Sequence, residues 1–464
     1  MPSPTPAIDR RISYRGETIL GAGRMLETDS HRTGLNNNML VIGLSGAGKT
    51  RDVLIPNLLQ MTSSYIVVDT KGTLCGSVGP VLAAHGYEVE RIDFTDLASG
   101  GSAGCAIASV GYDPLRFIRC PRTRGRTAPS QQDILSVARA LCPVENERDP
   151  FWDHAAANLM ACLIAYVMEV LPERERSFAA VVSLAEGLGT GEAFNRLQMH
   201  AEADEGTLAA SLYRRYAGTV VAEKMNASII GVLSEKMAVL GFDGANRLYR
   251  CPRQVDLASF GTRKRALFVT VSDIDRALDP LVSLFLSQAL TALMRAADSA
   301  PSGALAVPVR FLLDDFANLR MPRIDEILAV VRSREIWCTL LLQSVSQLEA
   351  LYGRPRAMSI MGNCDTHLVL GFQDLDTAHA FSERADRMPT SLLLTPFDRA
   401  WLFIRGRRAE EVARFQLEDH PRYGEFQNPP TPPASRWPAG CGYPPMEFEA
   451  AVADGFDLEG EIPY

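Results

Sequence analysis

The sequence has few of the features that mark extracellular or metal-binding proteins. Its nine cysteines are an odd number without a C-x-x-C pair, and its seven histidines show no ligand spacing. Scattered thiols of this kind are typical of a reducing compartment and argue against a zinc module or a disulfide framework. We therefore expect no transition-metal site.

A signal peptide and a convincing membrane span are also missing. Residues 1–6 lead into polar, charged sequence rather than an apolar core. The most apolar run, Ala155–Leu171, is at the short edge for a span and has no basic bias on its flanks. We interpret this run as a buried core helix. The expected location is the cytoplasm, either free or peripheral at the inner face of the cell membrane.

An excess of positive charge is absent as well, because the net charge is −8. No global basic field recruits nucleic acid, so any contact with DNA must be local. Three local basic segments could provide it, although solvated loop charge explains each of them equally well. Their members are Arg116, Arg119, Arg122, Arg124 and Arg126; Arg263, Lys264 and Arg265; and Arg405, Arg407 and Arg408.

What the chain does have is a phosphate-binding loop. A G-x-x-x-x-G-K-T motif directly follows the apolar run Met39–Ile42. Glycines let such a loop wrap closely around phosphates, and its amides favour the anion. Lys49 would reach the β- and γ-phosphates of ATP, and the Thr50 hydroxyl would bind Mg²⁺. The expected nucleotide-binding residues are Gly43, Leu44, Ser45, Gly46, Ala47, Gly48, Lys49, Thr50 and Arg51.

A P-loop needs an acidic partner on a neighbouring strand, and one segment fits well. Val309–Asp315 is a mostly apolar strand that ends in two acids, the form of a Walker B element. We expect Asp314 to hold Mg²⁺ through water. Asp315 is the candidate general base or water-orienting group.

Strand-like and helix-like segments alternate on both sides of a helical middle. This pattern predicts an α/β protein with a mostly parallel sheet covered on both faces. The expected strands are Met39–Ile42, Tyr65–Asp69, Tyr87–Phe94, Ala266–Val271, Val309–Asp314, Trp337–Leu342, His367–Gly371 and Ala400–Arg405. The expected helices in this part are Lys49–Met61, Leu281–Arg295, Arg323–Val331 and Leu375–Arg384.

At 464 residues and 47% apolar content, two or more domains are expected. The predicted nucleotide-binding domain is discontinuous and comprises residues 36–114 and 256–425, after an N-terminal segment 1–35. Residues 115–255 form a predicted all-α insertion, and residues 426–464 are a Pro-rich linker and an acidic tail. The insertion's expected helices are Gln131–Leu141, Asp153–Val170, Phe178–Glu186, Gly191–His200, Glu205–Ala217 and Ala222–Leu240.

Motifs along residues 35–423 resemble those of one family. The P-loop with the asparagines before it, Ser64–Gly72, Tyr112–Leu115, Asp149–Trp152 and the dense stretch Phe311–Gly353 look like the coupling proteins of conjugative type IV secretion, the TraG/TraD-like ATPases. This resemblance implies a hexameric ring ATPase with a RecA-like core and an all-α domain. Such proteins pass a relaxase-bound DNA strand or a protein substrate to the membrane components of a secretion channel.

The resemblance also implies roles for three further residues. Gln343 matches the polar residue that senses the γ-phosphate, and Arg332 or Arg334 lies where an arginine could complete a neighbouring subunit's site. The expected catalytic set is therefore Lys49, Asp314, Asp315, Gln343, Arg332 and Arg334, with ATP and Mg²⁺ as cofactors.

Three departures from the family pattern keep two functions open. Asp315 stands where the family has Glu, the usual N-terminal transmembrane helices are missing, and the segment between Glu383 and Leu394 looks short. The chain is either an ATP-driven translocase or a docking platform that binds nucleotide but turns it over poorly. A DNA pump of the chromosome-segregation kind is disfavoured by the all-α insertion and the lack of a winged-helix tail.

Overall fold

A nine-stranded sheet organises the protein, with strand order β13-β12-β11-β3-β10-β9-β4-β8-β5. The computed structural model describes residues 16–95, 107–123, 126–145, 148–220, 222–272, 274 and 276–431. Arg124, the Pro-rich linker beyond Thr431 and the acidic tail lie outside the described residues. The strands of the sheet are β3 (Met39–Ile42), β4 (Ser64–Asp69), β5 (Glu88–Asp93), β8 (Arg265–Thr270), β9 (Val309–Leu313), β10 (Ile336–Leu342), β11 (Thr366–Val369), β12 (Arg399–Ile404) and β13 (Glu410–Ala413).

The strands from β11 to β5 all run parallel, and β12 and β13 add an antiparallel edge. Every residue of β3, β4, β8, β9 and β10 is buried. Continuous apolar strands of this kind belong to parallel sheets that helices cover on both faces. The predicted α/β class with a mostly parallel sheet is confirmed.

Side chains of the strands divide between two cores because successive residues point to opposite faces. Leu40 and Ile42 of β3 belong to the larger core, whereas Met39 and Val41 belong to the smaller one. The smaller core lies under η1 (Lys49–Leu54), α2 (Ile55–Leu59) and α3 (Thr73–Ala84). Helices on the other face are α11 (Asp279–Ser299), α12 (Ile324–Val330), α13 (Val345–Tyr352), α14 (Arg354–Gly362) and α15 (Leu375–Ala385).

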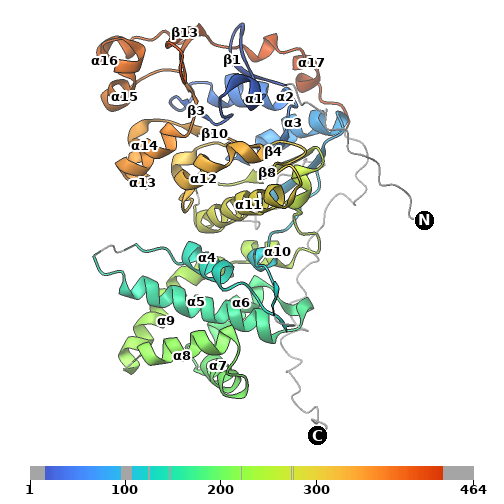
Figure 1. Ribbon diagram of the computed structural model, residues 1–464, viewed down its shortest axis with the longest axis vertical. Coiled ribbons are helices and arrows are strands. Elements are labelled where there is room, and N and C mark those ends of the chain that lie inside the picture. The colour runs from blue at the N-terminus through green and yellow to red at the C-terminus, as the bar shows by residue number, and fades with distance from the viewer. Residues whose placement is uncertain are drawn as a thin grey trace, which may run out of the picture.

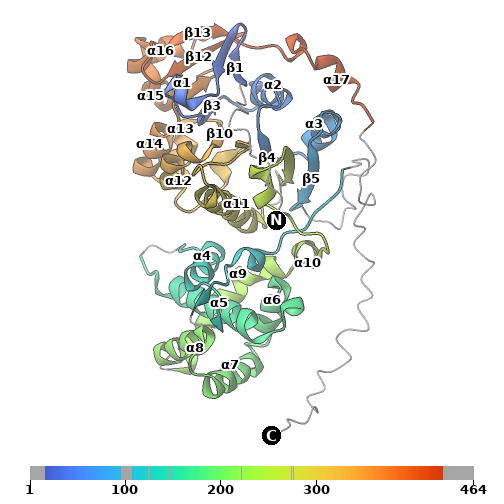
Figure 2. The ribbon, with the colours of Figure 1, turned by 45° about the vertical axis from the view of Figure 1, so that its right-hand side comes forward.

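In the described part of the chain between β5 and β8, seven α-helices gather at one end of the molecule, beyond α11 (Figures 1 and 2). They are α4 (Gln131–Leu141), α5 (Phe151–Val170), α6 (Phe178–Glu186), α7 (Glu192–Ala203), α8 (Leu208–Thr219), α9 (Glu223–Ala238) and α10 (Asp243–Arg250). Helix α5 is the centre of this bundle and packs against α4, α6, α8 and α9.

Within the described residues, α5 and α11 are each long and apolar enough to cross a membrane, and Glu223–Gly241 with Asp243–Arg250 passes the same test only as a pair bent by 69°. In the fold, 72% of the apolar window of α5 and 56% of that of α11 is buried within the protein. Helix α5 thus forms the core of the helical bundle, as we interpreted its apolar run, and α11 lies between that bundle and the sheet.

Polar contacts join the helical bundle to the sheet. The carboxylate of Asp113 accepts hydrogen bonds from the backbone N–H groups of Leu115 (2.9 Å) and Phe178 (3.1 Å), and the Tyr112 hydroxyl donates to Gln288 of α11 (2.6 Å). Burial raises the pKa of Asp113 to about 6. The motif Tyr112–Leu115 is therefore the junction between the two parts.

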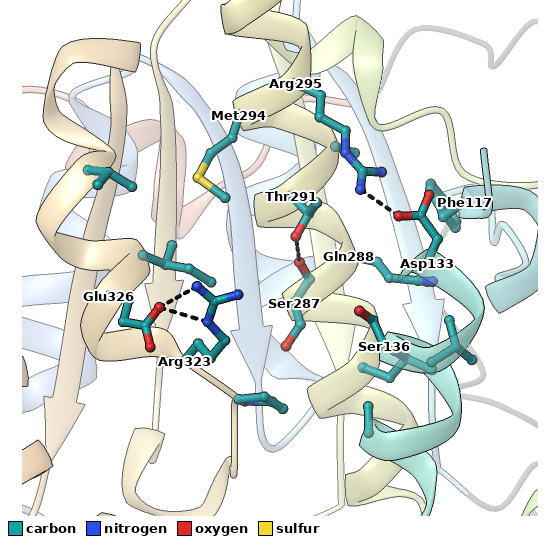
Figure 3. A pocket seen from close by; sticks show the side chains of 17 residues that line it. Phe117, Asp133, Ser136, Ser287, Gln288, Thr291, Met294, Arg295, Arg323 and Glu326 are labelled. Atoms are coloured by element: carbon teal, nitrogen blue, oxygen red, sulfur yellow. Dashed lines mark hydrogen bonds and ion pairs between the residues drawn. The ribbon is translucent and has the colours of Figure 1, made fainter. Parts of the chain in front are cut away.

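A cavity of about 420 Å³ opens where α4 meets α11 and α12 (Figure 3). Its charged side chains are paired: Arg295 binds Asp133 at 2.8 Å, and Arg323 binds Glu326. Asp133 also accepts two hydrogen bonds from the Arg119 side chain. Burial acts to raise the pKa of Asp133, but the bonds from Arg119 and Arg295 together hold it below its ordinary value. The carboxylate thus fastens α4 to α11.

Several elements differ from the sequence-based expectation. Residues 16–35 carry the hairpin of β1 (Glu17–Gly21) and β2 (Arg24–Glu27) and the short α1 (Ser30–Thr33), none of which was predicted. The predicted helix Lys49–Met61 is helical over residues 49–59, but residues 49–54 form a π-helix, in which the Ile55 N–H bonds the Thr50 carbonyl, instead of an α-helix. A regular α-helix through this segment would need a backbone N–H at position 56, and Pro56 has none, which favours the change of helix type here. Helices α16 (Pro389–Leu392) and α17 (Tyr423–Gln427) were also missed.

Candidate functional site

The predicted phosphate loop connects β3 to η1 at the carboxyl edge of the parallel strands. Gly48 has φ +87°, and a Cβ there would lie 2.4 Å from Asp52 Oδ2. Only glycine fits this position, because it accepts the left-handed conformation and leaves room for the carboxylate. Ser45 and Gly46 are exposed at the tip of the loop. The loop thus presents its backbone to solvent at the start of a helical segment, where N–H groups favour anions.

Lys49 is buried, with 7% of its surface exposed, and turns back onto the loop. Its Nζ donates hydrogen bonds to the carbonyls of Gly43 (2.6 Å) and Leu44 (3.0 Å). Burial lowers the pKa of Lys49, whereas the charges of Asp314 and Asp315 act to raise it. The ammonium therefore lies inside the loop and close enough to both predicted acids to feel their charge.

Thr50 and Asp314 meet directly. The Thr50 hydroxyl donates to Asp314 Oδ2 at 3.1 Å, although the two residues are 264 positions apart in the sequence. Strand β10 lies between β3 and β9 in the sheet. The contact between Thr50 and Asp314 therefore passes over the carboxyl end of β10. Burial is the main cause that raises the pKa of Asp314, followed by the charge of Asp315. The Thr50 hydroxyl and the Asp314 carboxylate thus lie side by side, and both are oxygen ligands of the kind that Mg²⁺ takes beside phosphates.

Asp315 follows β9 in a left-handed conformation, with φ 48° and ψ 42°. Its backbone N–H donates to Asp314 Oδ1 at 3.0 Å. Its own side chain is partly exposed, and its carboxylate accepts no hydrogen bond within the described part of the chain. Asp315 therefore fixes the rotamer of Asp314 through its backbone while its carboxylate stays free beside the loop.

The other predicted site residues lie at the two opposite ends of the parallel strands. Gln343 directly follows β10, between the ends of β3 and β9, and is thus beside Lys49, Thr50 and Asp314. Arg332 and Arg334 precede β10, whose seven residues at about 3.3 Å each separate them from this edge by roughly 20 Å. The structure brings Gln343 to the loop and does not bring the two arginines there.

The sequence comparison decides the family. A family model described as "Type IV secretory system Conjugative DNA transfer" matches residues 7–387. The chain belongs to this family. The predicted resemblance to coupling proteins is confirmed.

Two curated relatives of this coupling protein family member are both described as "Protein VirD4". The one from Rhizobium radiobacter is 21% identical over 374 residues, which cover 78% of this chain and 50% of the relative. The one from Rhizobium rhizogenes is 20% identical over 376 residues, which cover 78% and 51%. The chain thus spans about half the length of the curated relatives it matches.

Solved structures of the conjugative coupling protein TrwB share the fold. TrwB in complex with the GTP analogue GDPNP superposes with a TM-score of 0.63 at 18% identity, covering 88% of this chain and 89% of TrwB. TrwB in complex with ADP and Mg²⁺ gives 0.61 at 18% identity, covering 83% and 87%. This likeness identifies the core as a RecA-like P-loop NTPase fold.

One residue of the site was not found from the sequence. Arg414 follows β13, is 6% exposed, and donates to the carbonyls of Ala47 (2.7 Å), Arg399 (3.0 Å) and Leu370. Burial lowers its pKa. Arg414 braces the phosphate loop of this coupling protein family member against the antiparallel edge of the sheet. A lone arginine in Glu410–Phe415 gives no motif, so only the fold shows its role.

Motif residues before β3 have a structural function. Asn36 exchanges hydrogen bonds with Asp365, through its N–H (2.6 Å) and its side-chain oxygen (3.1 Å). Asn38 accepts from the Cys338 N–H (3.0 Å) and donates to the Asn363 carbonyl (3.1 Å). These asparagines align β3 with β10 and β11, which sets the position of the loop that follows.

The three basic segments differ in how much free charge they carry. Arg265 is 3% exposed and pairs with Glu90 (2.5 Å), and Arg263 contacts Glu88 at 3.7 Å. Arg119 pairs with Asp133, and Arg405 with Asp365 at 3.1 Å. Among the described residues, the members that are exposed and form no ion pair are Arg116, Arg122, Arg407 and Arg408, whereas Lys264 is half-buried over the Tyr87 ring.

Proposed function

We propose that this chain is an ATP-dependent coupling protein that delivers relaxase-bound single-stranded DNA or protein substrates to a type IV secretion channel. The observation that carries the proposal is the contact between Thr50 and Asp314 at 3.1 Å beside the buried Lys49. These are the Walker A hydroxyl, the Walker B acid and the phosphate-binding lysine in one place. Relatives of the same fold have been solved with an ATP analogue and with ADP and Mg²⁺.

The residues of the loop have separate tasks in this proposal. Phosphate oxygens would replace the carbonyls of Gly43 and Leu44 as partners of Lys49, which already lies within the loop. Thr50 and Asp314 would hold Mg²⁺, the Asp through water, and the metal would neutralise charge on the phosphates. Arg51, Ser45 and Ala47 complete the loop around the nucleotide.

Asp315 and Gln343 are the proposed water-orienting pair. Asp315 has a free carboxylate next to Asp314. Gln343 directly follows β10, the strand that lies between β3 and β9. A base and an amide at this edge could position a water for attack on the γ-phosphate. Asp is shorter than Glu, so the left-handed backbone of Asp315 decides how far its carboxylate reaches.

The proposed active form is a ring, a hexamer by family resemblance. Arg332 and Arg334 lie roughly 20 Å from their own loop, so they could serve only a neighbouring copy. Arg332 is exposed and donates to the Ser30 carbonyl at 3.3 Å, whereas Arg334 is held by Asp298 at 2.7 Å. Arg332 therefore has more freedom to act in trans, where an arginine stabilises charge in the transition state.

Residues 115–255 form the proposed all-α domain that selects cargo. Its described helices α4–α10 gather at one end of the molecule, beyond α11 (Figure 1). Local DNA contacts would come from the exposed basic residues Arg116, Arg122, Arg407 and Arg408. The proposed place of work is the cytoplasmic face of the cell membrane, beside the membrane components of the channel.

The second candidate is a nucleotide-binding docking platform with weak turnover. The shorter acid at Asp315 favours it, since a 1 Å misplacement can cost about 100-fold in rate. ATP turnover by the purified chain, measured with and without single-stranded DNA over a range of protein concentrations, separates the two. A translocase gives turnover that rises more steeply than linearly with concentration or on DNA addition. Turnover at background under all these conditions would favour the platform.

A further inference from the structure

An exposed aromatic ring lies beside the phosphate loop. Phe397 is 73% exposed at the apex of the turn Pro396–Arg399, which precedes β12. The Arg399 N–H donates to the Pro396 carbonyl at 3.0 Å and closes this turn. A single exposed apolar side chain is common on protein surfaces, so the contacts of this ring decide what it can bind.

Arg414 fixes this turn through two hydrogen bonds and a contact with the Phe397 ring. Its backbone N–H donates to the Asp398 carbonyl at 2.9 Å and its Nε to the Arg399 carbonyl at 3.0 Å. The guanidinium carbon lies 4.5 Å from the centroid of the Phe397 ring. One face of this ring is thus covered by a buried cation, and the ring keeps its other face open.

The same guanidinium contacts the phosphate loop. Its Nη1 donates to the Ala47 carbonyl at 2.7 Å. With a C–N bond of about 1.3 Å between these two contacts, the Phe397 ring centroid lies within roughly 9 Å of the Ala47 oxygen. The ribose and base of a nucleotide bound in the loop span a comparable length.

We propose that the open face of Phe397 stacks on the purine base of the nucleotide whose phosphates bind in the loop Gly43–Thr50. This inference rests on the nucleotide binding in the proposed function and adds the subsite for the base. Bases stack on aromatic rings whatever their hydrogen-bonding edge, so the subsite favours large purines over small pyrimidines without selecting strictly between adenine and guanine. Arg414 then serves as a positioning residue for both the base and the loop.

A second copy of the chain is the other occupant that an exposed ring could take. Two neighbouring apolar residues, Leu394 (80% exposed) and Met388 (72% exposed), enlarge the apolar surface around α16. Phe397, however, is joined to the phosphate loop through Arg414, which contacts both the ring and the Ala47 carbonyl. We therefore assign Phe397 to the base and use Leu394 as the matched control.

The test compares two ligands on the full chain by titration calorimetry. ADP with Mg²⁺ probes the phosphates and the base together, whereas tripolyphosphate with Mg²⁺ probes the loop alone. Phe397→Ala is expected to weaken ADP binding about ten- to a hundredfold, the usual loss for one stacked base, and to leave tripolyphosphate binding within twofold. Phe397→Trp should keep the parent affinity for ADP, and Leu394→Ala should change neither ligand. The preference for ADP over CDP should fall in Phe397→Ala.

Other outcomes overturn the assignment. Unchanged ADP affinity in Phe397→Ala, or an equal loss for ADP and tripolyphosphate, would show that the ring does not contact the base. Loss of self-association in sedimentation, with ADP affinity intact, would assign Phe397 to a contact with a second copy. If the parent binds tripolyphosphate but shows no preference for ADP, the base subsite fails while the loop stands. A parent that binds neither ligand overturns both the proposed function and the subsite.

Discussion

Replacement of Asp315 by Asn tests the proposed chemistry most directly, because it removes one negative charge and keeps the shape of the side chain. Asp315 is in the left-handed region, with φ 48° and ψ 42°, a conformation that Asn tolerates as well as Asp. We therefore expect the free energy of unfolding to change by no more than about 0.5 kcal/mol. Any large loss of activity then reports on chemistry and not on folding.

The expected loss is that of a general base. Turnover should fall by about 10²–10⁴-fold, which corresponds to roughly 3–5 kcal/mol of barrier. Nucleotide binding should survive, since Lys49, Thr50 and Asp314 remain. Mg²⁺ should still bind through Thr50 and Asp314, although the loss of one nearby negative charge weakens the attraction for the cation.

Asp315→Glu completes the comparison. Glu restores the family's longer side chain but tolerates the left-handed region less well, at a cost of about 1 kcal/mol. As a translocase, this variant should match or exceed the parent rate despite lower stability. As a docking platform, the parent is near background, Asn changes little and Glu raises turnover.

Asp386 supplies the matched control. It has nearly the same backbone conformation, φ 52° and ψ 48°, at the end of α15 and away from the loop. Asp386→Asn and Asp386→Glu should reproduce the stability changes and leave turnover within about twofold. The measurements are steady-state ATP hydrolysis, calorimetric binding of a non-hydrolysable analogue, and urea unfolding. Robust parent turnover that Asp315→Asn leaves intact would refute the assignment of this acid.

Three further predictions concern single residues. Lys49→Ala should abolish nucleotide binding in calorimetry while circular dichroism stays that of the parent; wild-type binding would contradict its role. Arg414→Lys keeps the charge but loses the fork that reaches several carbonyls at once, so analogue affinity should fall on the order of tenfold, and unchanged affinity would show that the brace is dispensable. Burial, reinforced by the charge of Arg384, lowers the pKa of His367 from 6.5 to about 4. As the pH falls, His367 is therefore protonated in the unfolded chain before it is protonated in the folded one. The free energy of unfolding should decrease between about pH 6.5 and about pH 4, by roughly 3 kcal/mol in all. His367→Gln should remove this dependence in urea unfolding followed from pH 7 to pH 4, and parallel curves for parent and variant would disprove it.

The central strands could be predicted because a parallel sheet buries both faces of each strand, which leaves uninterrupted apolar runs such as Val309–Leu313. The hairpin of β1 and β2 escaped prediction because β1 has only two large apolar residues, Ile19 and Leu20, and the first two of the four residues of β2 are exposed. Helix α3 was hidden by Gly76, Gly79 and Pro80, which contradict helix propensity. Tertiary packing overrides that propensity here.

The features of the site likewise fall into two groups, those that the sequence reveals and those that only the fold reveals. The loop and the acidic pair are continuous in sequence and carry a motif, so their residues could be named in advance. The inward turn of Lys49, the left-handed backbone of Asp315 and the brace from Arg414 depend on segments that only the fold brings together. The basic segments show the limit of composition, because Arg265 proves to be a buried partner of Glu90.

The opposite placement of the loop and of Arg332 has a consequence for symmetry. Under the proposed trans mechanism, each copy offers its loop on one edge and its arginine on the other. A two-fold dimer pairs one surface patch with itself, so it could complete its sites only if a single patch held both the loop and the arginine, which lie roughly 20 Å apart at opposite ends of β10. A heterologous, head-to-tail assembly needs no such patch; every contact then has a direction, and every incomplete oligomer has two unlike ends. Such an oligomer becomes fully active only when its ends meet, and a copy with a defective loop would still supply its arginine to the next.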